Sequence, residues 1–156
     1  MFVRSNGEWV QEARLVGSGG ADAFARSVSL SGDRALVGAF EDPEGARRGA
    51  AYVFVRSGST WTREATLVAG DAAFEEYFGY SVSLSGDQAL IGSPHDNDSR
   101  GAAYVFGRTG GVWRQEAKLV STDGEAGAQL ALAVSLSPLG NRALVGGPGA
   151  AYVFSR

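Results

Sequence analysis

The only histidine of this 156-residue chain, His95, lies in a polar stretch among residue types that carry hydrolytic chemistry. Ser93 precedes it and Asp96 and Asp98 follow it, which supplies a nucleophile, a base and an acid. A catalytic triad requires these three groups to converge in space, with the base between the other two. Neighbouring positions of one loop do not meet that requirement. We therefore expect an exposed loop histidine and no enzyme activity.

The same stretch contains the beginning of a cation-binding pattern, Asp96-Asn97-Asp98. Aspartates at positions i and i+2 open many calcium loops, in which several oxygen atoms surround the ion. Here Ser99 and Arg100 follow, and a third carboxylate is missing. Asp96 and Asp98 are weak metal candidates, so we expect a solvated loop and no bound cofactor.

The elements that must position this stretch recur three times. VSLSGDRALVGAF begins at Val28, VSLSGDQALIGSP at Val82 and VSLSPLGNRALVGGP at Val134, and each is followed by Ala-Tyr-Val-Phe. A second pattern, Trp-x-x-Glu-Ala-x-Leu, recurs at a constant spacing of 52 residues and begins at Trp9, Trp61 and Trp113. A fixed period near fifty with strand-like content predicts propeller blades or a solenoid.

Each repeat contains four strand-like segments. Alternating apolar and small polar residues lead into the two-residue turn Gly32-Asp33, which suits a tight antiparallel hairpin. A nearly all-apolar segment returns, and after a polar loop the Ala-Tyr-Val-Phe segment forms a third strand. By simple alternation, one face of the fourth strand should carry Trp61, Arg63, Ala65 and Leu67. Four short antiparallel strands per repeat are typical of a propeller blade.

Short motifs at fixed places in the repeats are similar to those of a known family. Phe78-Gly79 matches an FG element and Gly92-Ser93-Pro94 matches a GAP element. The degenerate counterparts in the other copies are Phe24-Ala25, Leu130-Ala131, Gly38-Ala39-Phe40 and Gly146-Gly147-Pro148. The chain thus resembles the FG-GAP repeats of integrin alpha subunits and bacterial surface proteins over essentially its whole length.

The resemblance implies an all-β fold, a β-propeller of four-stranded antiparallel blades. The blades would span about residues 24–68 and 78–120, with a split blade formed by 130–156 and 2–16. It also implies a non-catalytic scaffold or adhesion-type interaction module of secreted or cell-surface origin.

One departure from the family concerns calcium. Integrin-type repeats that bind calcium carry an Asp-x-Asp-x-Asp-Gly loop between the first two strands, which supplies the oxygen ligands that a hard cation needs. In this chain the connection is Ser31-Gly32-Asp33, Ser85-Gly86-Asp87 or Pro138-Leu139-Gly140-Asn141. One carboxylate per turn does not make that site, so we do not expect the calcium role of the family here.

The amino-acid composition excludes several classes of function. The net charge is −3, which gives no electrostatic case for nucleic-acid binding, and the absence of cysteine excludes disulfide and thiolate chemistry. The first residues contain no apolar segment of the kind found in a signal peptide or a membrane anchor, so we expect no membrane insertion.

The two ends of the sequence are complementary. Phe2-Val3-Arg4 aligns with Phe54-Val55-Arg56, so the sequence opens within a third strand and continues into a fourth, from Trp9 to Val16. The segment ending at Phe154 completes a third strand. Three blades are fewer than the usual four to eight of a closed ring. We expect a C2 homodimer that closes a six-bladed propeller by strand complementation; the alternative is a piece of a longer propeller.

Function would then reside in the loops. In integrin-like propellers the 4–1 and 2–3 connections form the ligand-facing side, and here they are largely acidic. The predicted ligand-binding residues are Glu41, Asp42, Asp71, Glu75, Glu76, Tyr77, His95, Asp96, Asp98 and Arg100. The ligand could be a protein, or a glycan stacked on the three tryptophans as in a propeller lectin. The alanines and leucines beside the tryptophans favour structural packing instead.

Overall fold

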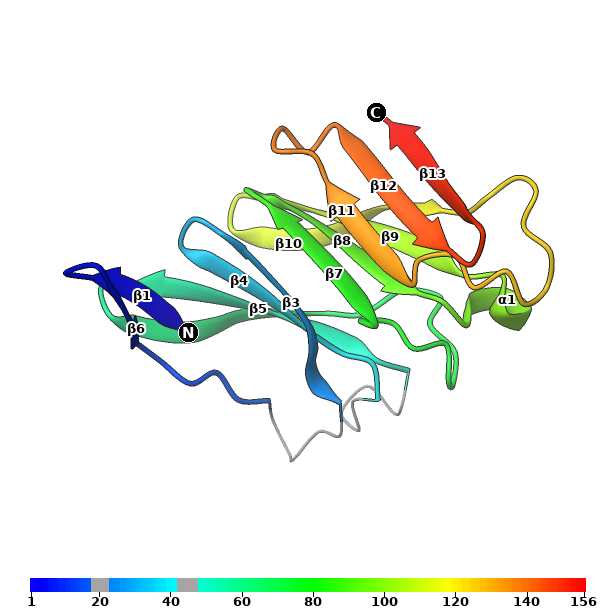
Figure 1. Ribbon diagram of the computed structural model, residues 1–156. Coiled ribbons are helices and arrows are strands. Elements are labelled where there is room, and N and C mark those ends of the chain that lie inside the picture. Colours follow the sequence, from blue (N-terminus) through cyan, green and yellow to red (C-terminus); the bar gives the residue numbers. More distant parts are fainter. Residues whose placement is uncertain (18–22, 42–47) are drawn as a thin grey trace.

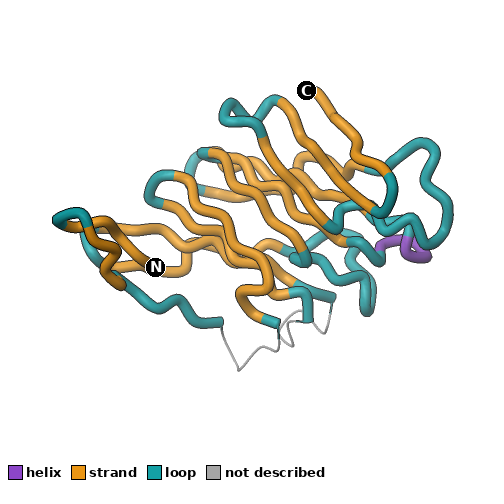
Figure 2. The backbone as a smooth tube through the Cα atoms, in the orientation of Figure 1, coloured by secondary structure: helices purple, strands orange, loops and turns teal. Residues whose placement is uncertain are grey.

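The computed structural model describes residues 1–17, 23–41 and 48–156. This part of the chain forms antiparallel strands joined by short turns and longer loops, with a single helical turn (Figures 1 and 2). The elements are β1 (Phe2–Ser5), β2 (Glu8–Gln11), β3 (Phe24–Ser31), β4 (Arg34–Ala39), β5 (Ala50–Ser57), β6 (Thr60–Leu67), β7 (Ser81–Ser85), β8 (Gln88–Ser93), α1 (Asp96–Ser99), β9 (Ala102–Thr109), β10 (Val112–Leu119), β11 (Ala133–Leu136), β12 (Arg142–Gly147) and β13 (Ala150–Ser155). No helix in these ranges has the length and apolar character needed to cross a membrane.

The strands form a series of up-and-down sheets, as the repeats predict. The order β3-β4-β5-β6 makes one four-stranded sheet and β7-β8-β9-β10 a second, while β11-β12-β13 has three strands and β1-β2 has two. The first strands lie together, because β7 contacts β3 and β4, and β11 contacts β7 and β8. Figure 1 shows the sheets following one another along the molecule. The prediction of an all-β fold with four-stranded antiparallel blades is therefore confirmed, and we call these sheets blades 1, 2 and 3, with β1-β2 as the N-terminal hairpin.

The predicted tight hairpin is also present. Ser31 pairs with Arg34 across Gly32-Asp33, and Gly32 has a φ of +56°. Left-handed backbone at this position is needed for a two-residue turn whose twist matches its strands, and glycine adopts it without steric cost. Blade 2 repeats the turn at Gly86.

Simple alternation fails on the fourth strand of each four-stranded blade. The pairing of β5 with β6 shifts between Val53 and Phe54, so that Glu64 is an extra, bulged residue. A bulge reverses the side to which the following side chains point. Trp61 consequently packs towards the N-terminal hairpin, whereas Ala65 and Leu67 pack towards blade 2. The prediction that Trp61, Arg63, Ala65 and Leu67 share one face is wrong for this reason.

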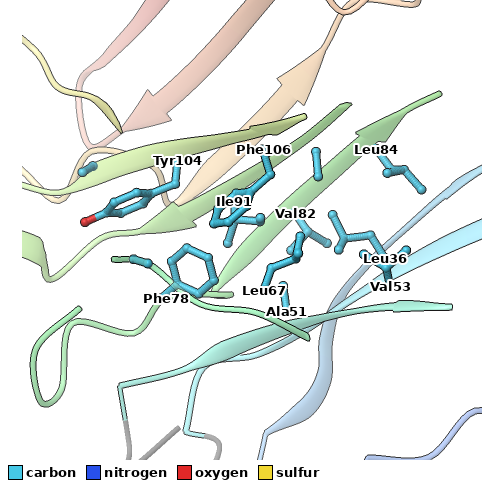
Figure 3. Packing of buried hydrophobic residues seen from close by; sticks show 13 residues of the cluster. Leu36, Ala51, Val53, Leu67, Phe78, Val82, Leu84, Ile91, Tyr104 and Phe106 are labelled. Carbon is cyan, nitrogen blue, oxygen red and sulfur yellow. The ribbon is translucent and has the colours of Figure 1, made fainter. Parts of the chain in front are cut away.

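The main hydrophobic core lies between blades 1 and 2. Leu36, Val53 and Leu67 of blade 1 meet Val82 and Ile91 of blade 2 (Figure 3). A corresponding cluster between blades 2 and 3 contains Leu90, Leu130 and Val145. Burial of such side chains stabilises by about 1.5–3 kcal/mol each, so each blade depends on its neighbours for its stability.

Candidate functional site

The described parts of the 2–3 and 4–1 loops lie at one end of the blades, where Figure 2 shows the helical turn and the longer connections of blades 2 and 3 together. Of the predicted ligand-binding residues, Asp42 lies outside the described residues. Glu41, Glu75, Asp98 and Arg100 are exposed on these loops. Asp71 is also at the surface, while Glu76 is half-buried.

His95 lies in an aromatic cluster that crosses from blade 1 to blade 2. Its ring is 4.4 Å from the ring of Tyr77, which lies 5.1 Å from Phe40, and Phe40 is 5.4 Å from Tyr80. The histidine is half-buried, and its Nε2 is 3.4 Å from Nε2 of Gln129 in the loop leading to blade 3. The prediction of an exposed histidine is therefore wrong, because aromatic packing between adjacent loops covers much of the ring.

The residue types of a hydrolytic triad do not converge here. Ser93 is buried, and its hydroxyl donates to the backbone carbonyl of Glu76 at 2.7 Å instead of to the imidazole of His95. Asp96 bonds to Tyr104 instead of the imidazole. The geometry thus provides no hydroxyl–imidazole–carboxylate relay at this loop.

Asp96 belongs to a buried network between the loops and the outer strands of blade 2. The Tyr104 hydroxyl lies 2.6 Å from Oδ2 of Asp96 and 2.9 Å from Oδ1 of Asp71, and so can donate to either carboxylate. The Lys118 ammonium is 2.7 Å from Asp71 and 2.8 Å from Asp96. The prediction of a solvated loop is wrong for Asp96 and fits only Asp98, since Asp96 is almost completely buried.

The electrostatics of this network follow from burial and charge. Burial, with the hydrogen bonds and charges of Asp96 and Asp71, raises the pKa of the Tyr104 hydroxyl well above its ordinary value. Burial alone would lower the pKa of Lys118, but the two carboxylates outweigh it and raise that pKa. Lys118 thus remains charged beside Asp71 and Asp96. Among the described residues, no group of three or more potential metal ligands comes together.

Tyr104→Phe tests the contribution of this network to stability. The change leaves two carboxylates with one fewer donor, and hydrogen bonds to charged groups are worth about 1.5–3 kcal/mol each. We expect the free energy of unfolding to fall by about 2 kcal/mol, measured by urea denaturation. Tyr152→Phe is the matched control, since Tyr152 donates to Asp123 in an exposed pair at 2.8 Å. Equal effects of the two changes would contradict a special role for the buried network.

A second network, which the sequence analysis missed, joins consecutive blades. Glu64 of blade 1 accepts hydrogen bonds from Trp113 Nε1 at 3.0 Å and from Arg108 of blade 2 at 2.8 Å, and it also pairs with Arg34 at 3.2 Å. The carboxylate is the bulged residue of the Trp-x-x-Glu pattern, and its constant position in the repeat is the signal that could have revealed it.

An analogous network joins the segment that follows the N-terminal hairpin to blade 1. Glu12 accepts from Trp61 Nε1 at 3.0 Å and from Arg56 Nη1 at 2.8 Å. The hydrogen bond from Trp61, followed by that from Arg56 and its charge, lowers the pKa of Glu12 despite the opposing effect of burial. The tryptophans of both networks thus support contacts between blades, as the packing interpretation predicts.

The glycines of the FG and GAP elements form a third contact between blades. Gly79 has a φ of +93°, and a β-carbon on Gly38 of blade 1 would overlap the carbonyl oxygen of Gly79. Ser27 donates to that same oxygen at 3.0 Å. On the next blade, a β-carbon on Gly92 would overlap the carbonyl oxygen of Ala131. The FG turn of one blade therefore packs directly against the GAP glycine of the preceding blade.

Comparison with known proteins agrees with this geometry. The profile of the FG-GAP repeat matches residues 9–54 and 61–106, together more than half of the chain. The chain belongs to the FG-GAP repeat family. No curated protein matches its sequence.

Among solved structures, this FG-GAP chain is similar to one chain in a crystal structure of a mitotic checkpoint complex. The TM-score is 0.55 at 13% sequence identity, over 83% of the FG-GAP chain and 36% of the other chain. The FG-GAP chain thus corresponds to about a third of that protein. At this identity the likeness concerns the fold alone.

The two ends of the FG-GAP chain differ from its middle. Val28 of blade 1 is 66% exposed, whereas its counterpart in blade 2, Val82, is 8% exposed. At the other end, Val153 of blade 3 is 67% exposed, whereas its counterpart Val53 is fully buried. The repeats are locally alike, so the difference comes from the neighbouring blade, which is present at one position and not at the other.

Proposed function

We propose that this FG-GAP chain is a non-catalytic scaffold or protein-interaction module that assembles with a second copy of itself through its two ends. In the assembly, three blades from each chain make a six-bladed ring, and the N-terminal fourth strand of each chain completes blade 3 of the other. The observation that carries the proposal is the pair of complementary open ends.

Several features support complementarity. Blade 1 presents Val28 and Leu30 on the side towards the N-terminal hairpin, beside a depression of about 670 Å³. Blade 3 presents Leu144 and Val153 on the opposite side. In the interior of the chain, side chains at these same repeat positions pack against one another in the core between blades 1 and 2. The ends therefore carry the two halves of a contact that the chain already makes internally.

The open edge of blade 3 supports strand complementation. β13 is an outer strand of a three-stranded sheet, and an exposed strand edge offers unpaired backbone groups that another strand can satisfy. Two identical contacts of this kind close a ring with C2 symmetry. Six blades fall within the usual range of about four to eight for a closed propeller.

The loop end of such a ring is the proposed ligand-facing side. Asp71, Asp96 and His95 are engaged within the fold, so their part in binding would be to shape the loops. The exposed groups left for a protein or glycan partner include Glu41, Glu75, Asp98 and Arg100. Trp61 and Trp113 are committed to contacts between blades, which favours a protein partner over a lectin-like stacking site.

Light scattering coupled to size exclusion tests the assembly. We expect a mass of about twice 16.2 kDa over a range of concentrations, with or without a chelator. Val28→Glu places a charge on the exposed end of blade 1 and should reduce the mass to that of one chain. Val112→Glu is the matched control, because Val112 is also a valine on the surface, 51% exposed against 66% for Val28, but lies on the last strand of blade 2. A monomeric unmodified chain at all concentrations would contradict the proposal.

A further inference from the structure

A groove opens between the last strand of blade 2 and the edge strand of blade 3. It has a volume of about 240 Å³. Its apolar lining includes Val105, Ala117, Leu119, Leu136 and Phe154. Its polar lining consists of one carboxylate, Glu116, together with Gln88, Asn141, Arg142, Ser155 and Arg156. In the structure, Glu116 pairs only loosely with Arg156, at 3.4 Å.

The corresponding place between blades 1 and 2 is filled by a tryptophan. There the counterparts of the groove residues belong to one cluster, against which Trp113 packs; they are Val53, Ala65, Leu67, Leu84 and Phe106. The Trp113 indole also donates to Glu64, the counterpart of Glu116, at 3.0 Å. The groove beside blade 3 therefore has the walls and the hydrogen-bond acceptor of a tryptophan site.

A second half-formed contact lies farther along the same edge. Tyr152 donates to Asp123 at 2.8 Å, as Tyr104 donates to Asp71 in blade 2. In blade 2 the pair is completed by the ammonium of Lys118 on the fourth strand. At the edge of blade 3, no fourth strand of the described chain supplies a cation.

One segment of the chain carries both missing groups at the correct spacing. Trp9 and Arg14 are five residues apart, as are Trp113 and Lys118, within the same Trp-x-x-Glu-Ala-x-Leu pattern. The Trp9 side chain is 71% exposed, in contrast to the packed Trp61 and Trp113.

We propose that the groove between β10 and β13 is the recognition site for residues 8–15 of a second copy. Trp9 of that copy fills the groove and donates its indole N–H to Glu116, while its Arg14 guanidinium pairs with Asp123. The backbone of the incoming segment extends the sheet beyond β13 as a fourth strand. This inference rests on the proposed self-assembly and names the residues through which the second copy is recognised.

In the proposal, the N-terminal strand β1 competes with β13 of the second copy for one edge of β2. Met1–Arg4 aligns with 153–156, and β1 pairs with β2 in the register that β5 uses with β6. The Met1 amino group also donates to Ala13 O at 2.6 Å. β1 thus occupies the edge of β2 that β13 of a second copy takes, so it must leave β2 before the ring closes.

A fluorescent peptide of residues 7–16 tests recognition separately from assembly. The receptor is the full chain carrying Trp9→Ala, which cannot fill the groove of a neighbour but keeps the groove itself. Hydrogen bonds to charged groups contribute about 1.5–3 kcal/mol, or roughly 10- to 150-fold in Kd. We therefore expect fluorescence anisotropy to report binding that weakens at least about tenfold with a Trp9→Ala peptide. Glu116→Gln in the chain should weaken binding of the unmodified peptide several-fold, as should Asp123→Asn.

A Val10→Ala peptide is the matched control and should bind like the unmodified one, because the fourth-strand counterparts of Val10 are exposed in blades 1 and 2. Binding that depends on Trp9 and Glu116, from a chain whose mass is that of a monomer, would support this site and overturn only the self-assembly. Absence of binding, or binding indifferent to Trp9, Glu116 and Asp123, would overturn the inference, even if the unmodified chain were a dimer.

Discussion

Gly79→Ala is expected to lower the free energy of unfolding by about 3 kcal/mol or more, because two costs add. A residue with a β-carbon pays about 1–2 kcal/mol for left-handed backbone, and Gly79 has a φ of +93°. Its β-carbon would also overlap the Ala50 carbonyl oxygen, and relieving such crowding costs about 1–3 kcal/mol. For a chain of this length, each kcal/mol lowers Tm by about 2–4 °C. Thermal and urea denaturation measure both quantities.

Gly58→Ala provides the control for Gly79→Ala. Gly58 has a φ of +62°, but no atom would lie within 4 Å of an added β-carbon. This change should lower the free energy of unfolding only by the cost of left-handed backbone at a residue with a β-carbon, about 1–2 kcal/mol. Equal losses for the two variants would show that the close contact between the FG turn and blade 1 does not contribute to stability.

Glu64→Ala is the second change with a large expected effect. It removes the acceptor for Trp113 and Arg108 of blade 2 and the partner of Arg34 in blade 1. Breaking a buried ion pair by removing one partner costs about 3–5 kcal/mol, and this network is partly buried. We expect a loss near the lower end, about 3 kcal/mol, because Asp87 lies 3.5 Å from each arginine and remains as a partner. Glu8→Ala, at an exposed glutamate of β2, should change stability little.

The same carboxylate gives a pH dependence. Burial opposes ionisation of Glu64, but the hydrogen bonds from Trp113 and Arg108 and the arginine charges prevail and lower its pKa from the ordinary value of 4.5. The stabilisation is therefore complete above the pKa of the unfolded chain and is lost as the pH falls through the lower pKa of the folded chain. The difference in unfolding free energy between the unmodified chain and Glu64→Gln should shrink below about pH 4.5. A difference that stays constant down to about pH 2 would contradict this assignment.

Local features of the fold could be read from the sequence because their causes are local. The two-residue turn at Gly32-Asp33 depends on backbone geometry that glycine alone adopts freely, and the 52-residue spacing reports the length of one four-stranded unit. The FG and GAP residues were identifiable for the same reason. Even where Gly79 is replaced in the other copies, Ala25 and Ala131 keep a positive φ, of 64° and 72°.

The candidate site was less predictable. The loop residues were identified as a group, but alternation along a strand could not reveal the bulge at Glu64, which turns the carboxylate towards Trp113 and Arg108. The sequence predicts that Asp96 is a solvated loop residue, but in the structure it is buried against Tyr104 and Lys118. Both outcomes depend on partners that are distant in the sequence.

The amino-acid sequence predicts the repeating unit, its four strands, its turns and its family, because each copy has the same local pattern of residues. The sequence does not predict which copies are covered by a neighbouring blade, and this is seen only in the three-dimensional structure. Val28 and Val82 occupy the same place in their repeats, and one is exposed while the other is buried. Burial depends on whether another sheet lies alongside, and that is a property of the arrangement of blades in space, which a local pattern does not encode. The unequal ends of the molecule and the groove beside blade 3 follow from that arrangement.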